Sequence, residues 1–350
     1  MNYGFGIIGL GLIADFHAQA IKELKGGKLV ACLSRKKEKA ISFASKYQCQ
    51  ASHSLEDFLS NPELDIVNIC TPSGAHLEPA IRAAEAGKHL IIEKPLEITL
   101  QRCDQIIEAC KKNGVKLTGI FQSRFFPLSR IIKNAIKQDR FGQLVLCDAY
   151  VKWQRNQDYY DKGGWHGTLH LDGGGALINQ SIHAIDLLNY FAGDVMEVSS
   201  CVATIGHQGI EVEDNAVASL RFKNGALGVI EGSTAVYPGF LKRIEISGTD
   251  GSAIMEEETL KTWDFKVKKE EDKEIIQQFM SDNVSGGGAS NPGAISYQGH
   301  KKQFENIIDA IKKDKKPLID GYEARKAVEI VIAIYQSARE KKIVHLPLSI

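Results

Sequence analysis

The pattern of apolar and polar positions divides the chain into two regions. Over the first 121 residues, short apolar runs alternate with segments of helical periodicity. The runs predict strands at Tyr3–Ile8, Lys28–Leu33, Ile66–Cys70, His89–Glu93 and Val115–Thr118. The segments between them predict helices at Leu12–Leu24, Lys36–Lys46, Leu77–Ala86 and Leu100–Asn113. This alternation predicts an α/β fold with a doubly wound parallel sheet, whose ligands bind at the carboxyl ends of the strands.

After residue 121 the pattern changes to strand-like runs joined by tight turns such as Lys223-Asn224-Gly225. The runs predict strands at Gln143–Tyr150, Val198–Ile205, Asn215–Phe222, Ala226–Gly232 and Leu241–Gly248. Helical patterns occur at Ile178–Phe191, His300–Lys313 and Tyr322–Lys341. The hairpin turns predict an open, mostly antiparallel sheet, and hence an α+β domain. We therefore expect one domain over residues 1–121 and a second over residues 122–350.

One stretch of the second region has the composition of a loop. Lys266 to Glu274 is heavily charged, and Ser285 to Ser296 is rich in Gly, Ser, Ala and Asn. We expect a mobile surface loop over this stretch, one that could order over a ligand.

Composition excludes several classes of function. Lys+Arg and Asp+Glu both total 43, so no net charge attracts nucleic acid or an acidic membrane. The seven cysteines are scattered, without a C-x-x-C pair, and no signal peptide is apparent, which predicts a cytoplasmic protein. No apolar run is long enough to span a membrane. We expect no metal site.

A glycine turn follows the first predicted strand. Gly9-x-Gly11-x-x-Ala14 stands between that strand and the next helix. Gly9 permits a tight turn, Gly11 lets the backbone approach a pyrophosphate, and Ala14 allows close helix packing. The helix N-terminus, with Leu12 and Ile13, faces the anion. These residues predict a dinucleotide site.

The end of the second predicted strand bears on the choice of dinucleotide. An acidic residue there would bind the adenine ribose, but this chain has Ser34 and Arg35, followed by two lysines. A hydroxyl and a guanidinium can bind a 2′-phosphate, so these residues favour NADP, with NAD as the alternative. They are also compatible with a solvated helix start.

Polar groups follow the next strand as well. Thr71 and Pro72 come after Ile66–Cys70, at the carboxyl edge of the predicted sheet. His76 lies four residues beyond Pro72. It could reach a ribose or phosphate of the dinucleotide, or it could cap a helix or lie in the core.

A lysine ends the strand His89–Glu93. Lys94 stands between Glu93 and Pro95, which fixes the exit path of the chain. An ammonium at this place could hydrogen-bond a reacting oxygen and stabilise developing alkoxide charge. The structural alternative is a surface lysine paired with Glu93.

The second region contains a glycine run followed by a helical pattern. Asn179, His183 and Asp186 follow Gly173-Gly174-Gly175 with the spacing i, i+4, i+7, which places them on one helix face. An imidazole, with an ordinary pKa of about 6.5, can take a proton from a carbinol as hydride leaves. Asp186 could orient that imidazole, or it could only satisfy a structural histidine.

The chain resembles the Gfo/Idh/MocA oxidoreductase family over essentially its whole length. The motifs that carry the resemblance are Gly9-x-Gly11-x-x-Ala14, Thr71-Pro72 with His76, Ala86-Gly87-Lys88-His89 with Glu93-Lys94-Pro95, and Gly173-Gly174-Gly175 with His183. The resemblance implies an N-terminal Rossmann domain and a C-terminal domain whose open sheet mediates assembly into a homodimer or homotetramer. It also implies an enzyme that oxidises or reduces a ring hydroxyl of a sugar, inositol or nucleotide sugar.

The resemblance further implies roles for single residues. Lys94 binds and polarises the substrate oxygen, and His183 is the general acid or base. The family often has an aspartate four residues before this histidine, where this chain has Asn179, whose amide can bind a hydroxyl but cannot accept its proton. Glu93 and Gln122 then lie near the cofactor, and Arg124 near the substrate.

Aromatic and polar residues precede the glycine run. Trp165 and His166 belong to this segment, with Trp153, Arg155, Tyr159, Tyr160 and His170. Rings beside hydrogen-bond donors suit a carbohydrate, although a buried aromatic cluster has the same sequence. We expect Trp165, His166 and Asn179 to bind substrate.

These observations predict an NAD(P)-dependent sugar or polyol dehydrogenase or reductase. Two other classes fit part of the pattern. One is a glycoside-cleaving enzyme that retains its NAD and oxidises the substrate transiently. The other is a non-catalytic dinucleotide sensor, which has no need of both Lys94 and His183.

Overall fold

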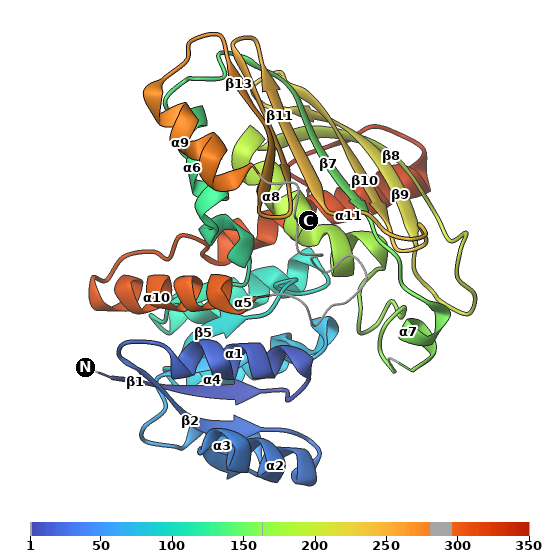
Figure 1. Cartoon of the computed structure of the whole chain (residues 1–350). Helices are drawn as coiled ribbons and strands as arrows, with labels where there is room; N and C mark the ends of the chain where they lie inside the picture. Colours follow the sequence, from blue (N-terminus) through green and yellow to red (C-terminus); the bar gives the residue numbers. More distant parts are fainter. Residues whose placement is uncertain (1, 163, 281–295, 350) are drawn as a thin grey trace. The chain divides into compact units, whose positions relative to one another are not determined.

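The computed structural model describes residues 2–162, 164–280 and 296–349. Its internal contacts divide the chain into two compact units (Figure 1). The first unit comprises Met1–Gln122, His170–Gly173 and Ser296–Val328, and the second comprises Ser123–Leu169, Gly174–Ile295 and Glu329–Ile350. The chain leaves the first unit close to the expected boundary after residue 121. The return of two later segments to that unit was not anticipated.

The first unit contains a parallel sheet, as the sequence predicts, but it has six strands, because Gln50–Ser52 forms one that was not expected. Its strands are β1 (Tyr3–Ile8), β2 (Gly27–Leu33), β3 (Gln50–Ser52), β4 (Ile66–Ile69), β5 (His89–Ile92) and β6 (Leu117–Gly119). Their order is β3-β2-β1-β4-β5-β6, and all pairs are parallel. The strands β2 and β3 lie on one side of β1, and β4 to β6 lie on the other, so the strand order switches between β1 and β4. In a doubly wound sheet the ligand site lies at this switch point, beyond the carboxyl ends of the strands.

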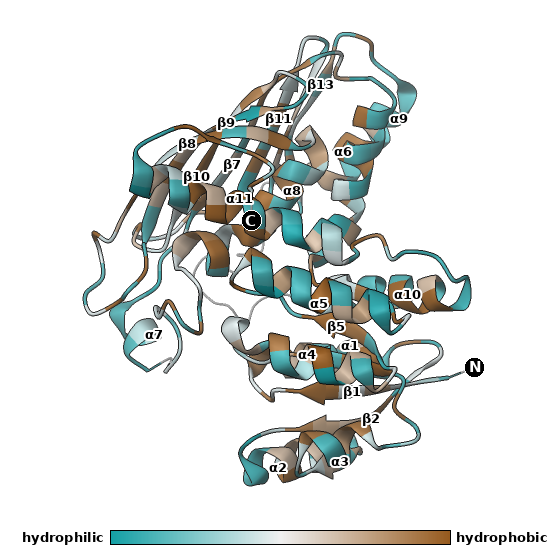
Figure 2. Ribbon diagram, turned by 180° about the vertical axis from the view of Figure 1, so that it is seen from behind, coloured by the Kyte–Doolittle hydropathy of each residue, from teal (hydrophilic) through white to brown (hydrophobic). Residues whose placement is uncertain are grey.

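Helices connect these strands. They are α1 (Leu12–Lys22), α2 (Lys37–Tyr47), α3 (Leu55–Leu59), α4 (Leu77–Glu85) and α5 (Leu100–Lys112), with a short 3₁₀ turn at Ser73–Ala75. From the C-terminal part of the chain, α10 (Gln298–Lys312) and the first residues of α11 (Gly321–Glu340) join this unit. Figure 2 shows α5 and α10 with both hydrophilic and hydrophobic residues along their length, as expected of helices with one buried face.

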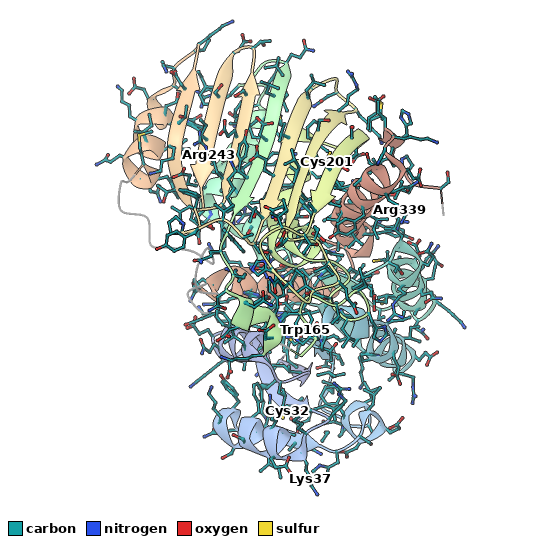
Figure 3. All side chains as sticks on the ribbon, turned by 90° about the vertical axis from the view of Figure 1, so that its right-hand side faces the viewer. Cys32, Lys37, Trp165, Cys201, Arg243 and Arg339 are labelled. Carbon is teal, nitrogen blue, oxygen red and sulfur yellow. The ribbon has the colours of Figure 1, made fainter. Side chains whose placement is uncertain are left out.

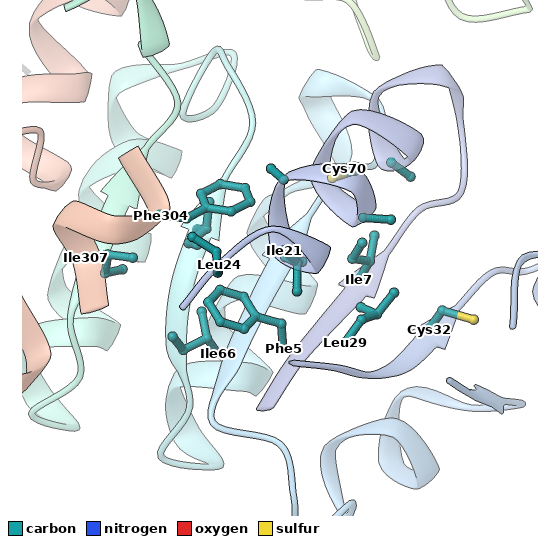
Figure 4. Close-up of a cluster of buried hydrophobic side chains, with 14 of the residues drawn as sticks. Phe5, Ile7, Ile21, Leu24, Leu29, Cys32, Ile66, Cys70, Phe304 and Ile307 are labelled. Atoms are coloured by element: carbon teal, nitrogen blue, oxygen red, sulfur yellow. The ribbon is translucent and has the colours of Figure 1, made fainter. Parts of the chain in front are cut away.

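Helix α10 completes the core of the first unit. Phe304 and Ile307 of α10 are fully buried in one cluster with Phe5 of β1, Ile21 of α1 and Ile66 of β4 (Figure 4). The rings of Phe304 and Phe5 stack with centroids 6.1 Å apart. Burial of each such side chain contributes about 1.5–3 kcal/mol. Helix α10 is therefore an integral part of the dinucleotide-binding unit, although it is more than 170 residues away from β6 in sequence.

The second unit contains an eight-stranded mixed sheet. Its strands are β7 (Leu144–Lys152), β8 (Val195–Ala203), β9 (Asn215–Phe222), β10 (Leu227–Ser233), β11 (Arg243–Gly248), β12 (Gly251–Glu256), β13 (Thr259–Phe265) and β14 (Val344–His345). The order is β13-β12-β11-β7-β10-β9-β8-β14. All neighbouring pairs are antiparallel except β7 and β10, which are parallel. The predicted open, mostly antiparallel sheet is confirmed.

The described helices of this unit, besides the later residues of α11, are α6 (Pro127–Lys137), α7 (Gln157–Asp161), a π-helical turn at Ala176–Ser181, α8 (Ile182–Ala192) and α9 (Glu270–Phe279). The π-helical turn and α8 pack against one face of the sheet, and α9 contacts β13. Helix α8 packs against β7 and β11, where Cys147 and Ala149 are buried. The other face keeps apolar side chains exposed, including Leu146 and Leu227, which are paired across β7 and β10. Figure 3 shows the side chains of this unit, with Cys201 of β8 and Arg243 of β11 labelled.

One expectation for the second unit is wrong. The charged stretch from Lys266 to Glu274 is not all loop, because α9 begins at Glu270 and its Asp272 accepts two hydrogen bonds from Arg140, at 2.6 and 2.7 Å. The helix expected over Ile178–Phe191 is present, but it is α-helical only from Ile182, after the π-helical turn. The Gly- and Ser-rich stretch expected to be mobile lies, up to residue 295, outside the described residues. No helix among the described residues is long and apolar enough to cross a membrane.

Candidate functional site

The glycine turn after β1 has the geometry of a dinucleotide-binding turn. Gly9 has φ +90° and donates its N–H to the Leu33 carbonyl at 3.0 Å, and a Cβ there would lie 2.7 Å from the backbone of Cys70. Gly11 is the N-cap of α1 and has no side-chain cap, and a Cβ on it would meet no atom within 4 Å. Ala14 is buried. The helix start therefore offers uncapped N–H groups beside open space, which suits a pyrophosphate.

Alanine substitutions should separate the roles of the two glycines. Gly9→Ala should destabilise the protein by at least about 1–3 kcal/mol, because of its left-handed φ and the clash with Cys70. Gly11→Ala should leave stability unchanged but weaken NADH binding about tenfold or more, the equivalent of about 1.4 kcal/mol. Urea unfolding and NADH fluorescence titration measure the two effects. Unchanged NADH affinity in Gly11→Ala would contradict a pyrophosphate at this turn.

The residues expected to choose between NAD and NADP lie after β2. The Ser34 hydroxyl accepts the N–H of Lys36 at 3.2 Å, just before α2. Arg35 is exposed. Ser34 thus makes a contact expected at the start of a helix. Arg35 is accessible to a ligand. The preference for NADP stays a prediction.

His76 connects the turns after β4 and β5. Its Nε2 lies 3.0 Å from the carbonyl oxygen of Thr71, and its Nδ1 lies 3.1 Å from that of Pro95 and 3.3 Å from that of Leu96. Burial lowers the pKa of His76, against the opposing effects of the Glu97 charge and these carbonyls. His76 is fully buried, so its described contacts hold the two turns together and give no support to ribose binding. The Thr71 hydroxyl donates to the Ala75 carbonyl at 3.0 Å.

The turn that carries Lys94 is fixed on both sides. Before it, the buried Glu93 accepts the backbone N–H of Lys94 on Oε2 at 3.1 Å. After it, the buried Glu97 accepts a hydrogen bond from Arg102 at 2.7 Å, and Arg102 also donates to the Gly74 carbonyl at 2.9 Å. Lys94 itself is half-buried. A rigid turn with a half-buried lysine suits a group that must be held in a fixed position.

The strand order brings three of the expected positions to one edge of the sheet. Gly9 directly follows β1, while Thr71 and Lys94 lie two residues after the ends of β4 and β5. These three strands are neighbours in the sheet. Gln122 lies at the end of the segment after β6, and its Oε1 is buried without a hydrogen-bond partner among the described residues. A buried acceptor needs a donor. The open cradle at Gly11 and this unsatisfied acceptor both fit a bound nicotinamide dinucleotide.

In the second unit, the π-helical turn at Ala176–Ser181 is anchored by one buried carboxylate. Glu213 accepts the N–H of Gly175 at 3.0 Å, the N–H of Leu177 at 2.8 Å and the Tyr335 hydroxyl at 2.9 Å. Its backbone carbonyl accepts the N–H of Ala176 at 3.0 Å. Burial raises the pKa of the Glu213 carboxyl, against the opposing effect of these donors. Glu213 therefore satisfies three consecutive amides at the start of the turn.

Loss of this carboxylate should destabilise the protein strongly. Glu213→Ala leaves two buried amides without an acceptor, at a cost of about 1–3 kcal/mol each, so the free energy of unfolding should fall by about 2–5 kcal/mol. Urea unfolding measures this change. The matched control is Glu274→Ala, at an exposed glutamate of the same unit, which should stay within about 0.5 kcal/mol of wild type. Equal stability of the two variants would refute the anchoring role.

The structure brings the predicted sugar-binding residues of this unit together. The ring of His166 lies between those of Trp165 and Tyr159, with centroids 4.1 and 4.3 Å away. Gln180 Nε2 donates to the Tyr159 hydroxyl and to Asn179 Oδ1, both at 3.0 Å. These contacts form a continuous aromatic and polar series from Trp165 to Asn179. Such a surface suits a carbohydrate ring.

Arg155 extends this series through a contact with Gln180. Arg155 donates to Gln180 Oε1 at 2.8 Å, and its guanidinium lies 5.1 Å from the ring centroid of Trp153 and 5.7 Å from that of Tyr159. Burial lowers the pKa of Arg155. Gln180 was not among the residues predicted to bind substrate. Its place directly after Asn179 is the sequence signal that could have identified it.

Arg124 and Asp186 form a buried ion pair. Arg124 Nε donates to Asp186 Oδ2 at 2.8 Å, and Nη2 donates to Oδ1 at 2.6 Å. The guanidinium also lies 4.7 Å from the ring centroid of Tyr190. These contacts attach α8 to the segment before α6, which is a positioning role rather than the expected contact with substrate. His183 lies in the first turn of α8 and is half-buried.

Three residues of the site have partners distant in sequence, and no local pattern indicates these contacts. Glu213 anchors the π-helical turn, and His17 and His300 both approach Glu93. His17 lies three residues after Ala14, on the phosphate-binding helix, but nothing local indicates its partner.

Two family models match the chain. Residues 3–121 match the oxidoreductase family with an NAD-binding Rossmann fold, and residues 129–254 match the GFO/IDH/MocA C-terminal domain. The first match covers the strands, glycine turn and Lys94 of the parallel sheet. The second covers the π-helical turn and α8.

Relatives and solved structures agree with these matches. An uncharacterized oxidoreductase of Bacillus subtilis, YrbE, is 31% identical over 71% of this chain and 72% of its own length. Myo-inositol 2-dehydrogenase of Thermotoga maritima is 25% identical over 97% of this chain and 98% of its own. The WlbA dehydrogenase from Bordetella pertussis, solved in complex with NADH and UDP-GlcNAcA, is 30% identical, with a TM-score of 0.88 and complete coverage of both chains. This chain belongs to the Gfo/Idh/MocA family of NAD-binding oxidoreductases.

Proposed function

We propose that the protein oxidises or reduces one ring carbon of a sugar-like polyol, with Lys94 and His183 as its catalytic residues. One observation carries this proposal. The dinucleotide turn at Gly9 and the ammonium of Lys94 follow strands of the same parallel sheet, at its carboxyl edge. A sensor needs the turn but not a lysine held rigidly at that edge.

The chain's own groups supply binding, polarisation and proton transfer. A nicotinamide dinucleotide, bound through Gly9, Gly11 and the N-terminus of α1, supplies the hydride acceptor or donor. Lys94 donates a hydrogen bond to the reacting oxygen and stabilises negative charge on it. His183 accepts the carbinol proton in oxidation and returns it in reduction. Asn179 donates to a hydroxyl but takes no proton, so the proton moves at His183.

The second unit supports a carbohydrate as substrate. The series from Trp165 to Asn179 presents ring faces beside amide and hydroxyl groups. Relatives named for inositols, an anhydrosugar and a nucleotide sugar bound with NADH show the classes that this family accepts. We place UDP-linked amino-sugar uronates first, because the WlbA structure resembles this chain over its full length.

The test begins with the cofactor. NADH and NADPH are titrated separately against the purified protein by nicotinamide fluorescence, and the tighter cofactor is then tested with UDP-sugars, free sugars and inositols. The proposal predicts binding of at least one dinucleotide, and a change in nicotinamide absorbance with one class of substrate. Failure to bind either dinucleotide would refute it. Tighter binding of NADH would refute the preference for NADP drawn from Ser34 and Arg35.

The open sheet of the second unit supports self-association. Leu146, Leu227 and Val217 are exposed on the adjacent strands β7, β10 and β9. We propose that a second copy covers this face in a homodimer or homotetramer. Light scattering tests the assembly, and a monomer at micromolar concentration would refute it. The cysteines are free thiols in the structure. The cytoplasmic location expected from the sequence stays a prediction.

A further inference from the structure

Three buried side chains from distant segments of the chain lie close together next to Lys94. They are His17 of α1, Glu93 after β5 and His300 of α10, with 0, 6 and 1% of their surface exposed. His17 Nε2 lies 2.7 Å from Glu93 Oε1, and His300 Nε2 lies 3.5 Å from the same oxygen. All three belong to the first unit. One carboxylate oxygen therefore faces two imidazoles.

The hydrogen bonds around His17 define its role. Asn68 Nδ2 donates to His17 Nδ1 at 3.0 Å, so the ring donates from Nε2 to Glu93. Burial lowers the pKa of His17, although Glu93 opposes this, and a neutral ring is sufficient for that hydrogen bond. His17 also packs edge-on against Phe304, with ring centroids 5.1 Å apart. This imidazole is thus a fixed donor within the core.

Glu93 connects the two histidines to the backbone of Lys94. While Oε1 faces the histidines, Oε2 accepts the Lys94 backbone N–H at 3.1 Å. Burial alone would raise the pKa of Glu93, but the hydrogen bond from His17 and the nearby His300 ring outweigh it and hold the pKa well below its ordinary value. The carboxylate is therefore ionised at neutral pH. The Glu93 charge also acts on two further titratable groups among the described residues, since it adds to the raising of the pKa of Cys70 by burial and opposes the lowering of the pKa of His76 by burial.

His300 is the least satisfied member of the cluster. Neither of its ring nitrogens has a hydrogen-bond partner among the described residues. A buried imidazole without partners costs free energy, so its place beside a carboxylate calls for an explanation. At 3.5 Å in a low-dielectric interior, its interaction with Glu93 is electrostatic and depends on the orientation of the carboxylate.

We propose that His300, with His17, is a positioning residue for Lys94: the two imidazoles hold the Glu93 carboxylate, which fixes the backbone of Lys94 and thereby the direction of its ammonium. This inference rests on the proposed function, in which Lys94 polarises the substrate oxygen. It gives α10 a part in catalysis without contact with substrate.

A metal ion is the other chemistry that fits two histidines and a glutamate. The three donor atoms lie within 4.8 Å of one another. Structural zinc takes four protein ligands, and the cluster offers three among the described residues. Catalytic zinc takes three but keeps a fourth position open to water or substrate, whereas these three side chains are buried and two already share a hydrogen bond at 2.7 Å. The observations therefore favour a hydrogen-bonded carboxylate.

The test compares His300→Phe, which places no polar N–H beside Glu93, with His300→Gln, which keeps one. The matched control is His53→Asn, at an exposed histidine of the same unit. Lysines are labelled by reductive ¹³C-methylation, and the Lys94 signal is identified by its loss in Lys94→Ala. We expect His300→Phe to shift the Lys94 signal and its titration midpoint. Its kcat should fall about 10²-fold, because a small misplacement of a catalytic group costs about that much, with NADH affinity retained. His300→Gln should restore most of both, and His53→Asn should match wild type.

Three results would overturn the inference. The first is a Lys94 signal and kcat in His300→Phe equal to those of wild type. The second is loss of folding or of NADH affinity in both His300 variants alike, which would mean a purely structural role. The third is stoichiometric zinc in the purified protein. The lysine titration needs no substrate, so a shift in His300→Phe without turnover in wild type would refute the proposed function and leave the positioning of Lys94 intact.

Discussion

Lys94→Ala is expected to lower kcat by at least about 10²–10³-fold while NADH binding stays near wild type. The loss follows from removing the hydrogen-bond donor at the reacting oxygen, where charge develops in the transition state. Binding should survive because the dinucleotide turn at Gly9 and Gly11 is built from backbone on a different strand. Steady-state kinetics with the identified substrate and NADH fluorescence titration measure the two quantities.

Two comparisons make the Lys94 result specific. Lys25→Ala removes an exposed lysine of the same unit and should match wild type in both measurements. Unfolding by urea should show that Lys94→Ala keeps its stability, since Lys94 is half-buried at the end of β5. Loss of NADH binding with kcat unchanged at saturating cofactor would assign Lys94 to the cofactor instead of the chemistry.

His183→Asn is expected to lower kcat by about 10²–10⁴-fold and to remove the acidic limb of the pH profile. In oxidation the imidazole must be neutral to accept the carbinol proton. Wild-type kcat/KM for oxidation should therefore fall as the pH drops and the imidazole becomes protonated. Asparagine keeps a hydrogen-bond donor but cannot accept a proton, so the residual rate should rise with hydroxide concentration.

His345→Asn is the matched control for His183→Asn, because it changes an exposed histidine of the same unit. It should leave the rate and the profile unchanged. An acidic limb that persists in His183→Asn would show that another group moves the proton. Since Asn179 offers no base, Lys94 would then be the first group to examine.

The alternating part of the fold could be predicted because each strand there is a continuous apolar run. The strands β1, β2, β4, β5 and β6 and their helices match the expected ranges within a few residues. The hairpin of β12 and β13 was missed because its turn holds Glu257, with φ +52°, where a glycine or asparagine would have indicated the turn. Helix α6 was missed although it has Pro127 in its first turn and buried Leu128 and Ile132 at helical spacing.

The candidate site could be predicted only where its residues lie in local motifs. The turn at Gly9 and Gly11 and the lysine at the end of β5 follow from strand, glycine and proline alone. The π-helical turn under Asn179 could not be predicted, because it depends on Glu213, a residue 34 positions later in the sequence. The approach of His300 to Glu93 depends on packing of α10 in the first unit, which no local pattern encodes.

The central claim is net hydride transfer between the substrate and a free nicotinamide. The most direct measurement incubates the enzyme with an excess of NAD⁺ or NADP⁺ and the active substrate, and follows reduced nicotinamide by absorbance and the sugar product by mass spectrometry. We expect one reduced nicotinamide for each sugar that has lost two hydrogens. A cleaved or rearranged sugar product without any accumulation of reduced nicotinamide would contradict this claim, and would identify an enzyme that retains its cofactor.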